Sequence, residues 1–104
     1  MNELESLTYQ IRQATDYQVN RRILREKIQT DLHFPLNGGL FKATQELIAF
    51  VTAWPDPVLY VEDTYQNPIE VAREEFLTLA CECYQKAMNR WHQENAELRK
   101  LRKI

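Results

Sequence analysis

The sequence predicts an α+β fold: a small three-stranded, mainly antiparallel sheet (strand-helix-strand-strand), one or two N-terminal helices and a long C-terminal helix. Three observations predict it. Residues 70–104 contain neither proline nor glycine, residues 58–71 hold two short β-type runs around a turn, and two glycines and four prolines leave little room for loops. The length of 104 residues and the 44% hydrophobic content indicate one domain, residues 1–104.

Residues 3–13 fit two structures. Their apolar side chains recur with the 3-4-3 spacing of an amphipathic helix, at Leu4, Leu7, Ile11 and Ala14. Apolar and polar side chains also alternate from Leu7 to Ile11, as in a half-buried strand. The helical match is longer and is our prediction, with the strand left open.

A second helix is predicted from Thr15 to about Leu32. Thr15 and Gln18 have the spacing of a capping box, which marks a helix N-terminus. One side of this helix is apolar, and the other carries basic residues that we interpret as a solvent-exposed face: Arg21, Arg22, Arg25 and Lys27. Proline and the Asn-Gly-Gly run in residues 33–39 then end the helix and turn the chain.

The middle of the chain supplies the sheet. Residues 40–43 are predicted as a short strand, and Thr44 caps a compact helix whose wide apolar surface is expected in the core. Residues 58–62 are the clearest strand, residues 63–68 form a turn, and residues 69–71 return as a partner strand. The acidic residues of this hairpin are interpreted as solvated edge charges rather than a cation site.

The C-terminal helix, about residues 70–104, is expected to organise the fold and to extend partly beyond the core. Its apolar face continues past the globular part as a heptad-like seam broken once by Glu94. We therefore predict an interface for a second copy or a protein partner, without choosing between them, at Trp91, Leu98 and Leu101.

Charge is unevenly distributed along the chain. Residues 38–80 carry seven acidic and two basic side chains, whereas residues 81–104 carry six basic and three acidic ones. The last helical turns hold a basic patch of Arg99, Lys100, Arg102 and Lys103, which the helix dipole partly accounts for. Binding of nucleic-acid phosphates by this patch is the alternative function.

The sequence argues against catalysis. His33 and His92 have no metal-ligating neighbour at helical spacing, and the HExxH, CxxC and GxSxG motifs are missing. Cys81 and Cys83 point to nearly opposite sides of their helix, so they neither bridge each other nor share a metal; buried or half-buried thiols are expected. We predict a non-enzymatic protein with no catalytic, cofactor-binding or metal-binding residue.

Several segments resemble a known group of proteins. The runs LTYQIRQATDYQVNRRIL, NGGLFKAT and VEDTYQNPIEV, followed by NRWH, are similar to small uncharacterised proteins of contractile-tailed marine cyanophages. The resemblance covers most of the chain and carries no functional residue. It implies a phage protein in the host cytoplasm that assembles or binds host proteins. The N-terminus lacks signal-peptide features and no apolar run is long enough for a membrane span, so an intracellular protein without membrane contact is expected.

Overall fold

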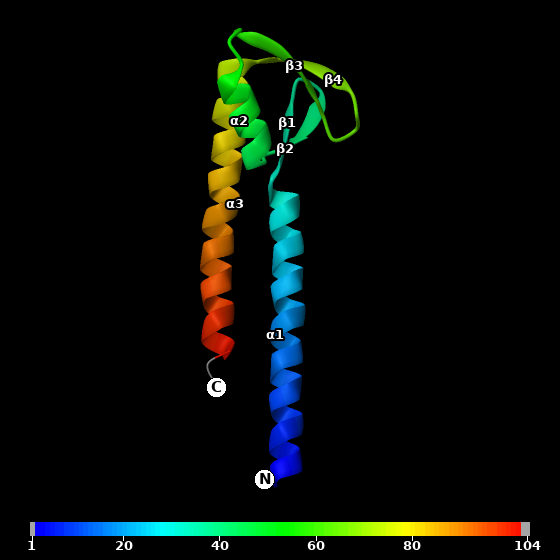
Figure 1. Ribbon diagram of the computed structural model, residues 1–104, viewed down its shortest axis with the longest axis vertical. Helices are drawn as coiled ribbons and strands as arrows, with labels where there is room; N and C mark the ends of the chain where they lie inside the picture. Colours follow the sequence, from blue (N-terminus) through cyan, green and yellow to red (C-terminus); the bar gives the residue numbers. More distant parts are fainter. Residues whose placement is uncertain (1, 103–104) are drawn as a thin grey trace.

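The computed structural model describes residues 2–102 and shows a long two-helix arm with a head at one end (Figure 1). Helices α1, Glu3–Asp31, and α3, Arg73–Arg102, run antiparallel side by side and form the arm. The molecule measures 68 × 23 × 18 Å, and its radius of gyration is 19.8 Å. A compact domain of this length has a radius of gyration of about 13 Å, so much of the arm lies outside any globular core.

Helix α1 is continuous, where the sequence predicted two helices. Asn2 caps it, since the Asn2 side chain accepts a hydrogen bond from the Glu5 amide at 2.8 Å. The capping box predicted at Thr15 is wrong: the Thr15 hydroxyl donates to the Ile11 carbonyl one turn earlier, at 2.9 Å. No proline or glycine interrupts residues 3–31, so the helix runs through this point. The strand alternative for residues 3–13 is also wrong.

The head contains two separate hairpins rather than one three-stranded sheet. Strands β1, His33–Leu36, and β2, Gly39–Lys42, pair antiparallel, as do β3, Val58–Glu62, and β4, Pro68–Ala72. The α+β class and the second hairpin are confirmed, and the three-stranded sheet is wrong.

The first hairpin accounts for that error. Asn37 and Gly38 form its two-residue turn, with positive φ angles of 50° and 81°. This tight turn makes residues 33–36 a strand and gives β2 a partner next to it in sequence. The sequence analysis had assigned residues 33–39 to a turn alone.

Helix α2, Gln45–Ala53, lies on α3 at the edge of the head (Figure 1). Its predicted cap is confirmed, because the Thr44 hydroxyl accepts a hydrogen bond from the Leu47 amide at 3.1 Å. Its predicted packing in the core holds in part: Val51 is buried and Leu47 and Ile48 pack against the core. Phe50 and Trp54, by contrast, are 52% and 37% exposed and pack on each other outside the core.

Helix α3 is the centre of the fold, and it contacts α1, α2, β1 and β4. Phe76 of α3 packs edge-on against Phe34 and Phe41 of the first hairpin, with ring centroids 5.4 and 5.3 Å apart. Phe41 and Phe76 are almost fully buried. The organising role predicted for the C-terminal helix therefore rests on its first half, within the head.

Asp63 joins the two hairpins. One carboxylate oxygen accepts from the Tyr65 and Asn67 amides at 3.1 and 2.9 Å, and the other accepts from the Leu40 amide at 3.2 Å. The Asn67 amide, ahead of the other donors, holds the pKa of Asp63 below its ordinary value. Gly39 is required beside it, since a Cβ there would lie 2.8 Å from Ile69. Asp63 is thus a buried structural carboxylate and not the solvated edge charge expected from the sequence.

Candidate interaction surfaces

Two of the three residues predicted as an external interface lie in the contact between the arm's own helices. Trp91 and Leu98 are half-buried and pack against the core cluster that includes Leu24 and Ile28 of α1. The side chain of Leu101 lies outside the described residues. These two seam residues thus contribute to packing within the chain and are half-exposed, and the external interface predicted there stays a prediction.

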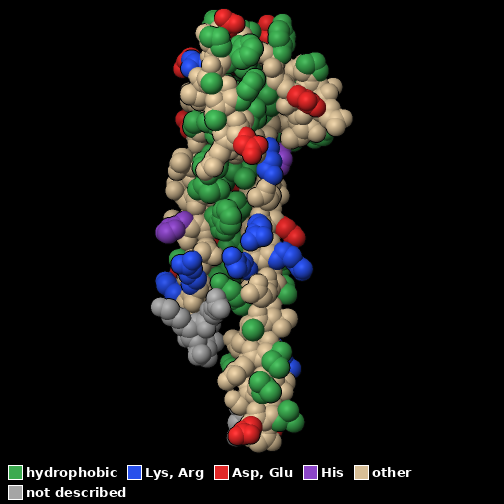
Figure 2. Space-filling view, in the orientation of Figure 1, with side chains coloured by type: hydrophobic (Ala, Val, Ile, Leu, Met, Phe, Trp, Pro, Cys, Tyr) green, Lys and Arg blue, Asp and Glu red, His purple; other side chains and the backbone are tan. Residues whose placement is uncertain are grey.

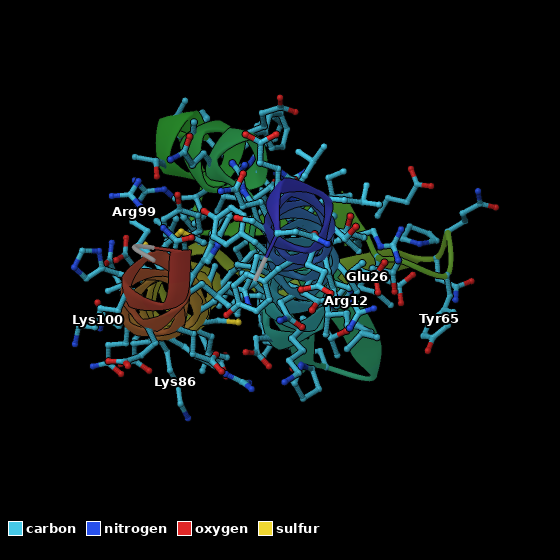
Figure 3. All side chains as sticks on the ribbon, turned by 90° about the horizontal axis from the view of Figure 1, so that it is seen from below. Arg12, Glu26, Tyr65, Lys86, Arg99 and Lys100 are labelled. Carbon is cyan, nitrogen blue, oxygen red and sulfur yellow. The ribbon has the colours of Figure 1, made fainter. Side chains whose placement is uncertain are left out.

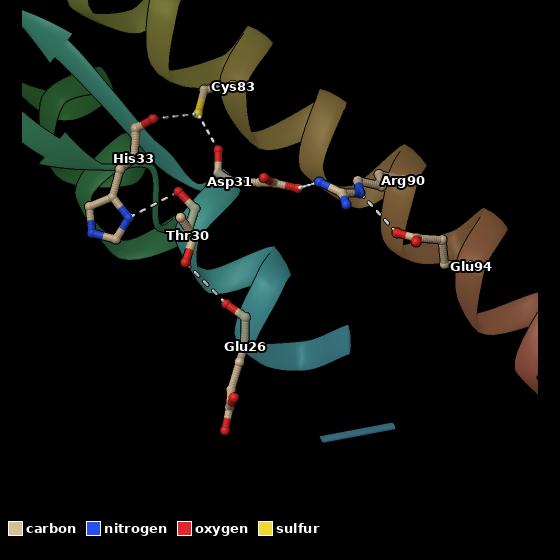
Figure 4. A network of polar contacts seen from close by, with 7 residues as sticks. All are labelled: Glu26, Thr30, Asp31, His33, Cys83, Arg90 and Glu94. Atoms are coloured by element: carbon tan, nitrogen blue, oxygen red, sulfur yellow. Dashed lines mark hydrogen bonds and ion pairs between the residues drawn. The ribbon is translucent and has the colours of Figure 1, made fainter. Parts of the chain in front are cut away.

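Polar contacts fix the register of the arm (Figure 4). The Cys83 thiol donates to the Asp31 carbonyl at 3.2 Å, and Arg90 forms ion pairs with Asp31 at 2.7 Å and Glu94 at 2.9 Å. These carboxylates, Glu94 first, raise the pKa of the Arg90 guanidinium. With Cys83 beside Asp31, the last described residue of α3 lies about level with residue 12 of α1 at 1.5 Å per residue.

The first part of α1 therefore projects beyond α3, as Figure 1 shows. The sequence analysis expected the C-terminal helix to extend beyond the core. In the structure the segment that extends furthest is residues 2–12, which we call the free end. The sequence predicted a helix here, but its amphipathic spacing does not show whether another element covers it.

Large apolar side chains are exposed on the free end. Leu4, Leu7 and Ile11 are 71%, 53% and 59% exposed, and Ala14, two residues past the free end, continues their spacing and is exposed as well. Figure 2 shows hydrophobic side chains on this end of α1. We call these four residues the free-end stripe. Leu4 and Ile11 lie about 140–160° around the helix from Leu24, which is buried in the arm. Leu7 and Ala14 lie about 80–100° from Leu24, so the stripe begins on the side away from α3 and turns toward the flank of the arm.

The α3 side of the free end is polar. Ser6, Gln10 and Gln13 lie in line with the buried Leu24 and Ile28, at whole numbers of turns along α1. The apolar row that contacts α3 is therefore replaced by polar residues near the level where α3 ends, and a different apolar row begins. A change of apolar face within one helix is a sequence signal that separates the free end from the arm.

Basic side chains gather in a band across the arm, on both α1 and α3 (Figure 2). We call this set the basic band: Arg21, Arg22 and Arg25 of α1, with Arg99 and Lys100 of α3. Arg99 and Lys100 were predicted to form a basic patch, whereas the arginines of α1 were predicted as a solvated face. Arg102 has no described side chain, and Lys103 lies outside the described residues.

Carboxylates neutralise little of the positive charge of the basic band. Lys100 pairs with Glu97 at 3.2 Å, but none of its arginines forms an ion pair within the described residues. In Figure 3, Arg99 and Lys100 project from the side of α3 that faces away from α1. Lys86 projects from a different side of α3, and Arg12 belongs to α1. The band thus combines exposed residues of two helices that lie about 75 positions apart in the sequence.

The cysteine and histidine side chains either pack within the fold or are exposed to solvent. Cys83 is half-buried, and burial, followed by the nearby Asp31 carboxylate, raises the pKa of its thiol. Cys81 is exposed, which corrects the expectation that both thiols are at least half-buried. His33 Nδ1 lies 3.3 Å from the Thr30 carbonyl (Figure 4). Within residues 2–102, no three His, Cys, Asp or Glu side chains are grouped to hold a metal ion.

Comparison with family models, curated proteins and solved structures finds no match to this chain. In the described part of the chain, no helix combines the length and apolar character that crossing a membrane requires.

Proposed function

We propose that this is a non-enzymatic assembly protein that self-associates, and that the free-end stripe of α1 is the contact surface. The observation that supports this is a row of large, exposed apolar side chains on a helix segment beyond the reach of α3. We prefer this surface to the C-terminal seam, because Trp91 and Leu98 of the seam are already half-buried against the core of the same chain. Assembly in a phage-infected host cytoplasm is the context that we propose for it.

Self-association would also stabilise the free end as a helix. The free end extends a helix that the arm already nucleates, but no packing against α3 holds its last turns. Burying a leucine or isoleucine side chain contributes about 1.5–3 kcal/mol when burial is complete. Pairing of Leu4, Leu7 and Ile11 with a second copy would therefore stabilise both the contact and the helix.

Light scattering in line with size-exclusion chromatography tests the proposal. The wild-type chain should be a dimer or larger, and the double variant Leu7→Asp with Ile11→Asp should be a monomer. These side chains are largely exposed in the single chain, so the variant should retain its helical circular dichroism.

The matched control is Tyr9→Asp with Ile23→Asp. It replaces two exposed apolar residues of α1 by the same charges, on faces about 140–180° from the stripe. The control should keep the wild-type mass. A monomeric wild-type chain, or a Leu7/Ile11 variant with the wild-type mass, would contradict the proposal.

A second function, binding of nucleic-acid phosphates, is favoured by the basic band. Four exposed arginines of the arm have no carboxylate partner among the described residues, Figure 2 shows Lys and Arg side chains gathered over both helices, and arginine binds phosphate through paired hydrogen bonds. Fluorescence anisotropy with a labelled duplex at low salt tests this function. Arg21→Glu with Arg25→Glu should abolish binding, while the control Arg12→Glu with Lys86→Glu should retain it. Equal loss in both variants would rule out a defined site.

A further inference from the structure

The row of the free-end stripe changes chemistry further along α1. Continuing its 3-4-3 spacing from Ala14 leads to Gln18, Arg21 and Arg25, all exposed. If two copies paired in parallel and in register, Arg21 and Arg25 would face the same residues of the second copy. Like charges opposite each other in a helix pair are destabilising. The stripe therefore favours self-pairing in which the arginines of the two copies lie apart.

An antiparallel arrangement meets this condition and adds a favourable contact. Glu3 and Arg21 are 18 residues apart, which is five helical turns, so both side chains project in the same direction. A two-fold axis perpendicular to α1 near residue 12 would then bring Glu3 of each copy beside Arg21 of the other. In the same register, Ile11 and Ala14 of the two copies interdigitate, and Leu4 of each copy lies between Gln18 and the aliphatic stem of Arg21 of the other.

The head also disfavours parallel pairing. The β3–β4 hairpin, including the labelled Tyr65, lies on the side of α1 opposite α3 (Figures 1 and 3). Leu4 and Ile11 of the stripe also face away from α3. A parallel second copy would place its own head beside this hairpin, whereas an antiparallel copy would end near Arg21, about 15 Å before α1 meets the head.

We propose that two copies of this chain form an antiparallel dimer through residues 4–18 of α1, with Glu3–Arg21 pairs fixing the register and Arg21 and Arg25 excluding the parallel arrangement. This inference rests on the self-association proposed above. It places the two heads at opposite ends of a long rod and leaves most of each basic band outside the contact.

Spin-label distance measurement on full-length protein tests the orientation. Cys81 is exposed and is labelled in a Cys83→Ser background, in which the serine hydroxyl retains a donor for the Asp31 carbonyl. The position of Cys81 at the head implies a separation above about 60 Å in the antiparallel dimer, at 1.5 Å per residue. A parallel dimer would place the labels less than about 40 Å apart.

The outcomes separate the two proposals. A dimer with the short distance would overturn the antiparallel orientation and leave self-association standing. A monomer at every concentration would overturn self-association, and with it this inference. A dimer with the long distance supports both.

Charge exchange tests the register. Glu3→Arg or Arg21→Glu alone should weaken the dimer about two- to five-fold, and the two together should restore it, because the ion pair is rebuilt with reversed polarity. As the matched control, Glu5→Arg, on another face of α1, should not rescue Arg21→Glu. In a parallel dimer, Arg21→Glu would replace one like-charge contact by another without rescue, so absence of rescue by Glu3→Arg overturns the register.

Discussion

Helices α1 and α3 have nearly the same length, 29 and 30 residues, but they differ in how much of each the chain covers. Apolar side chains of α3 pack against the core from Phe76 to Leu98. In α1 only Leu24 and Ile28 are buried, and the large apolar residues of its first half are exposed. Two amphipathic helices of one chain can therefore serve different purposes: α3 holds the fold together, and the first half of α1 offers a surface.

The largest effect should come from truncating a buried side chain in the first turn of α3. Phe76→Ala removes a fully buried ring that contacts Phe34 and Phe41, and it should lower the free energy of unfolding by about 3–5 kcal/mol. Urea denaturation followed by circular dichroism measures this loss. A change below about 1 kcal/mol would mean that the aromatic cluster does not support the head.

A matched pair of leucines compares the two helices directly. Leu98→Ala in α3 should destabilise the single chain by about 1–2 kcal/mol, less than a fully buried leucine, because Leu98 is half-buried against the core. Leu7→Ala in α1 should change the free energy of unfolding of the single chain by less than about 0.5 kcal/mol, because Leu7 is largely exposed. Thermal unfolding of dilute protein gives both values. Equal effects would show that the free end is covered within the chain.

Acid should weaken the head before the arm. The pKa of Asp63 is lower in the folded chain than in the unfolded chain, so its carboxylate contributes stability above its unfolded pKa of about 4. That contribution is lost as the pH falls through the lower, folded-state pKa. Near-ultraviolet circular dichroism from the head aromatics should therefore be lost on acidification before the helical signal. Asp63→Asn should unfold more readily at pH 7 and depend less on pH, and an unchanged pH profile would contradict this role.

The sequence predicted the local structure well where neighbouring residues determine it. The cap at Thr44, the β3–β4 hairpin and the long C-terminal helix follow from side chains within a few positions of each other. The capping box at Thr15 failed because a threonine hydroxyl satisfies the preceding helical turn as readily as a free helix end. The single sheet failed because hairpin turns at Asn37–Gly38 and residues 63–67 gave each strand a local partner.

The candidate surface was harder to predict because it depends on how two distant helices align. The stripe of Leu4, Leu7 and Ile11 was visible, but periodicity does not say whether α3 reaches it. That depends on the register set by Cys83 and Arg90 against Asp31. The same alignment brings Arg99 into a band with the arginines of α1, a grouping that no local pattern encodes.

Amide hydrogen exchange at several protein concentrations tests the central claim most directly, since it needs no substitution. Self-association through the free end predicts that amides of residues 5–14 become more protected as concentration rises, while those of residues 24–31, packed in the arm, are protected throughout. Exchange of residues 5–14 that is fast and the same at every concentration would contradict the claim that this surface binds a second copy.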